Sequence, residues 1–118
     1  MVVSPTLLPA ANSRRGIMSA VHMTYFFSTT GEPELVEKQC DELMQLLLAM
    51  EQGDPRVTDS TVSADLGLGV VEVEAYAKAS TREEAEALIA ARIETVVRST
   101  AGLFDAVERE RRIELIDA

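Results

Sequence analysis

The sequence predicts a single α+β domain in which a four-stranded antiparallel sheet carries two helices on one face. Residues 70–78 alternate apolar with charged or polar side chains, which is typical of an antiparallel strand with one solvated face. Two longer segments repeat apolar residues at spacings of three and four, as amphipathic helices do. These segments are separated by turn residues in the order βαββαβ, which leads to the predicted fold class.

The length of 118 residues is that of one domain. Two prolines and the absence of periodicity predict that residues 1–20 are a disordered or irregular N-terminal extension. We therefore expect residues 21–118 to form one α+β sandwich.

The first strand is predicted over residues 21–28, where side chains alternate with a period of two. One face carries Val21, Met23, Tyr25 and Phe27, and the other carries His22, Thr24, Phe26 and Ser28. Pro33 then suits the first position of a helix that ends near residues 50–52. The apolar stripe of this helix is Val36, Cys40, Leu43, Met44, Leu47 and Leu48. The only cysteine lies in this stripe, which favours a buried thiol over a nucleophile.

Residues 57–66 predict a more polar second strand, as expected at the edge of a sheet. One face carries Ser60, Val62, Ala64 and Leu66, and the other carries Asp59, Thr61, Ser63 and Asp65. Glycines at 67 and 69 predict a hairpin turn into the third strand, residues 70–78. In that strand Val71, Val73, Ala75 and Ala77 alternate with Glu72, Glu74, Tyr76 and Lys78.

Ser80 and Glu83 have the spacing of a capping box, with Ser80 as the N-cap of a helix that runs to about Ala101. The stripe of this helix is Ala85, Leu88, Ile89, Ile93, Val96 and Val97. Residues 113–116 predict a short fourth strand. The resulting order is that of the ferredoxin-like, or split βαβ, fold, in which the first and third strands are central neighbours.

That topology predicts one surface where chemistry could occur, the sheet face away from the helices, called here the open face. The candidate ligand or interface residues on it are His22, Phe26, Glu72, Glu74 and Tyr76. The sole histidine could act as a general base or a ligand, and the two glutamates could share a proton or a hard cation. The alternative interpretation is a solvated surface on which alternating glutamates only maintain solubility.

The net charge of -9 disfavours binding to nucleic acid or to anionic membranes. The sequence contains no apolar run of 18 residues, so we expect no membrane segment and a cytoplasmic location. With one histidine and one cysteine, no zinc motif is available, and we predict no cofactor.

Three functional hypotheses remain open. The favoured one is a non-enzymatic module that forms homodimers or binds a small molecule, because an uncovered sheet face commonly pairs with a second copy. The alternatives are a small cofactor-free enzyme on the open face and a divalent-cation binder.

Overall fold

The structure, a computed structural model, describes residues 18–100 and 106–116. Its elements are β1 (Ser19–Thr29), α1 (Pro33–Gly53), β2 (Val57–Asp65), β3 (Val70–Ala79), α2 (Arg82–Ser99) and β4 (Ala106–Ile116). The four strands form one sheet in the order β2-β3-β1-β4, and all neighbouring strands are antiparallel. The predicted ferredoxin-like fold is confirmed.

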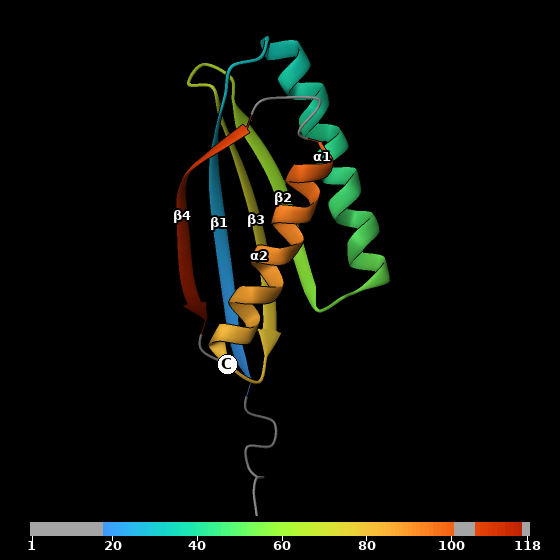
Figure 1. The fold of residues 1–118 in the computed structure, drawn as a ribbon, viewed down its shortest axis with the longest axis vertical. Helices are drawn as coiled ribbons and strands as arrows, with labels where there is room; N and C mark the ends of the chain where they lie inside the picture. The colour runs from blue at the N-terminus through green and yellow to red at the C-terminus, as the bar shows by residue number, and fades with distance from the viewer. Residues whose placement is uncertain (1–17, 101–105, 117–118) are drawn as a thin grey trace, which may run out of the picture.

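Both helices lie on the same face of the sheet (Figure 1). The inward side chains of β1 and β3 alternate with outward ones, so every second residue packs against a helix. The largest fully buried side chains include Met23, Leu43, Leu47, Ile89 and Ile93, which come from one strand and both helices. The core therefore lies between the helices and the sheet.

Two helix predictions need correction. The N-cap of α2 is Thr81, not Ser80, because the Thr81 side chain accepts a hydrogen bond from the backbone N–H of Glu84 at 3.1 Å. The Ser80 hydroxyl instead donates to the Glu84 carboxylate at 2.9 Å. On α1, Leu48 was expected in the buried stripe but is 48% exposed.

A β-bulge in β2 changes which of its residues face the helices. Asp59 has a positive φ of 54° and lies where the β2–β3 register shifts between Thr58 and Thr61. The extra residue lets Val57 join the core on the helix side, whereas unbroken alternation would place it on the face predicted for Asp59. The assignment of Asp59 to a regular open-face row was therefore wrong.

The fourth strand is much longer than predicted. It covers 11 residues, from Ala106 to Ile116, and pairs with β1 along its whole length. Strand β1 begins at Ser19, slightly before the expected domain boundary at residue 21. Residues 1–17 and 101–105 lie outside the described residues, including the expected helix end near Ala101. Within the described ranges, no helix is both long and apolar enough to cross a bilayer.

Candidate functional site

The open face brings the predicted residues together on β1 and β3. His22 pairs in register with Tyr76, and its Nε2 lies 3.0 Å from Oε1 of Glu74. Its Nδ1 lies 3.8 Å from Oε1 of Glu114, a residue of β4. Carboxylates therefore flank both ring nitrogens of His22, and a chemical role for this cluster stays a prediction.

Phe26 lies four residues after His22 on the same face and has glutamates beside it on both neighbouring strands. Its register partners are Glu72 on β3 and Glu110 on β4. The guanidinium of Arg112 covers the ring, 4.8 Å from its centre, and pairs with Glu110 at 3.1 Å. Sequence reasoning missed these β4 residues because it began the fourth strand only at residue 113. In the described part of the chain, no three histidine, cysteine or acidic side chains are grouped to hold a metal ion.

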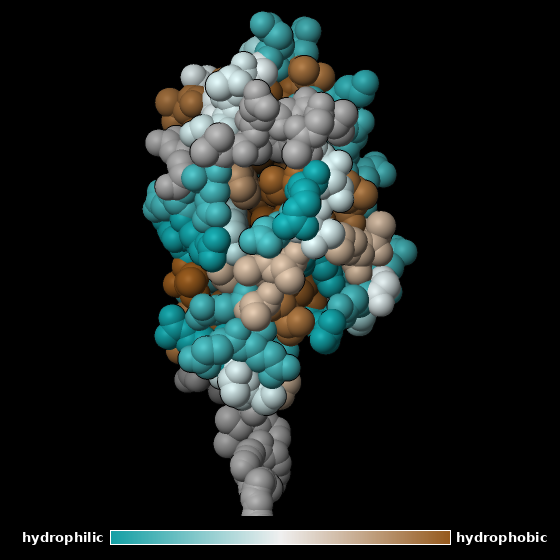
Figure 2. All heavy atoms as spheres, in the orientation of Figure 1, coloured by the Kyte–Doolittle hydropathy of each residue, from teal (hydrophilic) through white to brown (hydrophobic). Residues whose placement is uncertain are grey.

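A cavity of about 210 Å³ lies on the opposite side of the sheet, between α2 and strands β1 and β4. Its walls are Tyr25 and Phe27 from β1 and Ile93 and Val97 from α2. The two aromatic rings are stacked, with centres 6.1 Å apart and planes inclined by 12°. Figure 2 shows apolar surface beside α2, framed by hydrophilic side chains. The cavity thus has apolar, partly aromatic walls.

The hydroxyl of Tyr25 is the unusual group at this cavity. Tyr25 is 3% exposed, and its hydroxyl has no hydrogen-bond partner within residues 18–100 and 106–116. Burial raises the pKa of Tyr25 above 10.0, although the nearby Arg111 opposes that shift. Leaving a buried polar group unpaired costs on the order of 1–3 kcal/mol, so such groups are uncommon in native proteins.

The rim of the cavity carries two ion pairs. Glu108 pairs with Arg111 on β4, with Nε and Nη2 of the arginine at 3.0 and 3.2 Å from the two carboxylate oxygens. On α2, Arg98 and Glu94 approach to 3.5 Å. Because both arginines have an acidic partner, the formal charge of this rim is balanced.

A second β-bulge produces the Glu108–Arg111 pair. In a regular strand, residues three positions apart point to opposite faces. The β1–β4 register shifts between Phe26 and Phe27, so that Glu108 pairs with Phe27 and Arg111 with Tyr25. Both charged side chains consequently lie on the helix side, and the Arg111 guanidinium sits 4.6 Å from the centre of the Tyr25 ring. Bulges are common beside functional sites because they redirect side chains.

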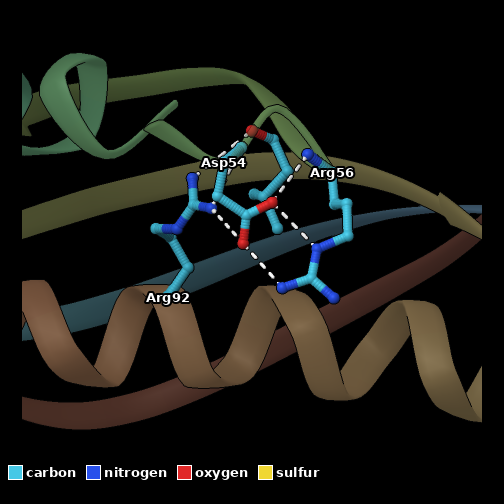
Figure 3. Close-up of polar contacts among 4 residues, drawn as sticks. Asp54, Arg56 and Arg92 are labelled. Atoms are coloured by element: carbon cyan, nitrogen blue, oxygen red, sulfur yellow. Dashed lines mark hydrogen bonds and ion pairs between the residues drawn. The ribbon is translucent and has the colours of Figure 1, made fainter. Parts of the chain in front are cut away.

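A separate polar cluster joins α1, β2 and α2 (Figure 3). The buried Arg92 of α2 donates hydrogen bonds to the backbone carbonyls of Asp54, at 2.8 Å, and Val57, at 3.4 Å. The Asp54 carboxylate makes two side-chain contacts with Arg56, at 2.8 and 2.7 Å, and hydrogen bonding to Arg56 holds its pKa far below 3.8. Arg92 also suits the negative end of α1, so this cluster is a structural link.

Cys40 is buried, as the sequence predicts, and burial raises the pKa of its thiol. The charged side chains Asp41 and Glu37 add to this shift. Such a thiol is protonated at neutral pH, which is the opposite of what a nucleophile needs.

Comparison with known proteins identifies the fold. No protein-family model matches the sequence, and no curated protein matches it. A solved candidate antibiotic biosynthesis monooxygenase from Chloroflexus aurantiacus J-10-fl is 14% identical, with a TM-score of 0.52 over 85% of this chain and 95% of that one. Another from Caulobacter crescentus CB15 is 13% identical, with a TM-score of 0.53 over 86% and 92%. At such identities the likeness shows the ferredoxin-like α+β fold alone.

Proposed function

We propose that this protein binds a small, planar and largely apolar molecule in the cavity between α2 and strands β1 and β4, called here the Tyr25 cavity. The observation that carries the proposal is that Tyr25, a residue lining that cavity, has a buried hydroxyl with no hydrogen-bond partner among the described residues. A few polar groups in an otherwise apolar cavity are typical of small-molecule sites.

The size and walls of the Tyr25 cavity define the class of ligand. An engineered apolar cavity of about 150 Å³ is large enough to bind benzene. The Tyr25 cavity, at about 210 Å³, has room for one or two fused rings. The stacked rings of Tyr25 and Phe27 provide a surface against which a planar ligand can pack.

The charges around the Tyr25 cavity favour a neutral ligand. Each rim arginine already has a glutamate beside it, so an anionic ligand would have to displace a carboxylate. The two similar structures carry names of candidate monooxygenases, which is compatible with a cavity for a small organic molecule in this fold. That likeness does not extend to a reaction.

The open face offers a second candidate function, a small cofactor-free enzyme. The specific observation that favours it is the 3.0 Å contact between His22 and Glu74, which could orient the imidazole as a general base. The His22 cluster has charged groups on both sides of the ring, whereas the Tyr25 cavity has apolar and aromatic walls that can enclose a ligand, so binding at Tyr25 is the stronger proposal. Pairing of two copies through the open face also stays a proposal.

The test is a titration with 2-naphthol followed by amide chemical shifts. We expect saturable shifts at Phe27, Ile93 and Val97. The substitution Val97→Phe should fill the cavity and weaken binding about tenfold or more, a loss of about 1.4 kcal/mol. The matched control is Leu88→Phe, on the same helix but lining a different cavity beside Arg92. Shifts confined to the open face, or equal binding by both variants, would contradict the proposal.

A further inference from the structure

We propose that a ligand displaces the Glu108–Arg111 ion pair and that the movement of Arg111 joins the Tyr25 cavity to a second cavity. The resulting groove accepts an elongated planar ligand with a neutral oxygen. This inference rests on the proposed function, because it assigns the ligand length and the access route of the same site.

Arg111 separates two adjacent cavities. It lines the Tyr25 cavity of about 210 Å³ and also a second one of about 250 Å³, whose other lining residues are Met23 of β1 and, on α2, Glu83, Glu86, Ala87 and Ala90. Tyr25 and Met23 are two positions apart on the same face of β1, which places them about 6.5–7 Å apart. That separation suits the addition of one ring to a ligand.

Part of β4 next to Met23, a lining residue of the second cavity, is uncovered on the helix side. Ile113 is opposite Met23 in the sheet, and Leu115 is opposite Val21, so both lie on the helix side. They are nevertheless 40% and 56% exposed. Figure 1 shows the reason, because β4 forms the sheet edge beside α2 and neither helix lies over it. An apolar wall therefore extends beyond Arg111.

The contacts that hold Arg111 in place are weak enough to be exchanged. Its side chain is 41% exposed and that of Glu108 is 38% exposed, and a surface pair of this kind shifts an equilibrium by about fivefold at most. Its stacking over the Tyr25 ring can be replaced by stacking of a planar ligand. Displacing the guanidinium uncovers the ring of Tyr25 and gives a ligand oxygen a route to its hydroxyl.

The charges near Tyr25 define the ligand oxygen. The carboxylates of Glu86, Glu94 and Glu108 all act on the Tyr25 hydroxyl and oppose its ionisation. They would repel a carboxylate or phosphate, whereas a hydroxyl or a carbonyl can pair with a tyrosine hydroxyl. We therefore infer a neutral phenol or ketone.

The experiment compares 2-naphthol, which fits the Tyr25 cavity, with 6-phenyl-2-naphthol, which has the same polar end and one further ring. Both are titrated against wild type, Glu108→Gln and Glu110→Gln. Glu108→Gln releases Arg111 without changing side-chain size. Glu110→Gln is the matched control, because it breaks the Arg112 pair on the opposite face of the same strand.

We expect Glu108→Gln to tighten binding of 6-phenyl-2-naphthol about threefold to fivefold, within the contribution of one exposed pair. Binding of 2-naphthol should change less than about twofold, and Glu110→Gln should alter neither affinity. With the longer probe, amide shifts should extend past Arg111 to Met23, Ala87 and Ala90. Tyr25→Phe should weaken binding of 6-phenyl-2-naphthol more than it weakens binding of the deoxy analogue, 2-phenylnaphthalene.

Two outcomes would overturn the inference, and they are distinguishable from failure of the proposed function. If 2-naphthol binds at the Tyr25 cavity but Glu108→Gln leaves the affinity of 6-phenyl-2-naphthol unchanged, displacement of the Glu108–Arg111 pair is rejected. The proposed binding of a ligand in the Tyr25 cavity then still stands. If the longer probe changes amide chemical shifts only for residues on one side of Arg111, the joining of the two cavities is rejected. Absence of binding by both probes would reject the cavity itself.

Discussion

The guanidinium of Arg111 lies 4.6 Å from the centre of the Tyr25 ring, and the hydroxyl of this tyrosine is buried without a partner in the described part of the chain. The arrangement depends on the bulge in β4, which turns Glu108 and Arg111 toward the same side of the sheet. A charged pair thus covers an apolar, aromatic cavity on the helix side. This relationship supports both the proposed ligand site and its proposed route of opening.

Removing the Tyr25 hydroxyl should not destabilise the protein. Tyr25→Phe deletes a buried polar group that has no partner, so the free energy of unfolding should rise by about 1 kcal/mol. Urea denaturation measures this difference. The control is Tyr76→Phe on the partly exposed open face, for which we expect a change within about 0.5 kcal/mol. A loss of 1 kcal/mol or more in Tyr25→Phe would mean that the hydroxyl has a partner in solution.

Arg92 should be important for stability. Arg92→Met leaves the carbonyls of Asp54 and Val57 without their donor, and we expect a loss of about 2–4 kcal/mol in the free energy of unfolding. Arg98→Met, on the exposed side of the same helix, should cost less than about 0.5 kcal/mol because its ion pair is on the surface. Equal urea midpoints for the two variants would show that the Arg92 link is not structural.

The Asp54 carboxylate should contribute to acid resistance. Its pKa is lowered in the folded protein, so the unfolded chain takes up the proton first as the pH falls. Its stabilisation is fully present above its ordinary pKa of 3.8 and is lost progressively below that pH. The difference in unfolding free energy between wild type and Asp54→Asn should therefore shrink between pH 6 and pH 2, as urea titrations at each pH would measure.

Arg56 supplies the control for this pH dependence. Its side chain is the first cause of the lowered pKa of Asp54, through hydrogen bonding. In an Arg56→Gln background, the effect of Asp54→Asn should vary much less with pH. If the difference between the Asp and Asn proteins keeps its full pH dependence in that background, the assignment of Arg56 as the main cause is wrong.

The homodimer proposal can be tested at Phe26. The substitution Phe26→Glu would place a third acid between Glu72 and Glu110, so pairing of two copies through the open face should be lost. Light scattering should show the mass of a dimer for wild type and of a monomer for the variant. Leu68→Glu, in the exposed turn between β2 and β3, should retain the dimer mass. A wild-type monomer, or a dimer in both variants, would reject this interface.

The register of the open face could be predicted because it depends on alternation alone. Once β1 and β3 are neighbours, a period of two places His22, Glu74 and Tyr76 on the same side. What alternation cannot predict is a bulge, since a single extra residue reverses the side on which every later residue lies. The placement of Val57 was not predicted for that reason. The Glu108–Arg111 pair was also missed because the fourth strand was expected to begin only at residue 113.

The amino-acid sequence by itself determined the order of the elements, the ferredoxin-like topology and the side of the sheet on which Tyr25 lies. These follow from local periodicity and from turn residues, which act over a few positions. Only the tertiary structure decided that Tyr25 lines a cavity, that its hydroxyl is unpaired and that Arg111 covers its ring. Those features depend on contacts among β1, α2 and a bulged β4, and such contacts are set by packing between segments distant in the chain.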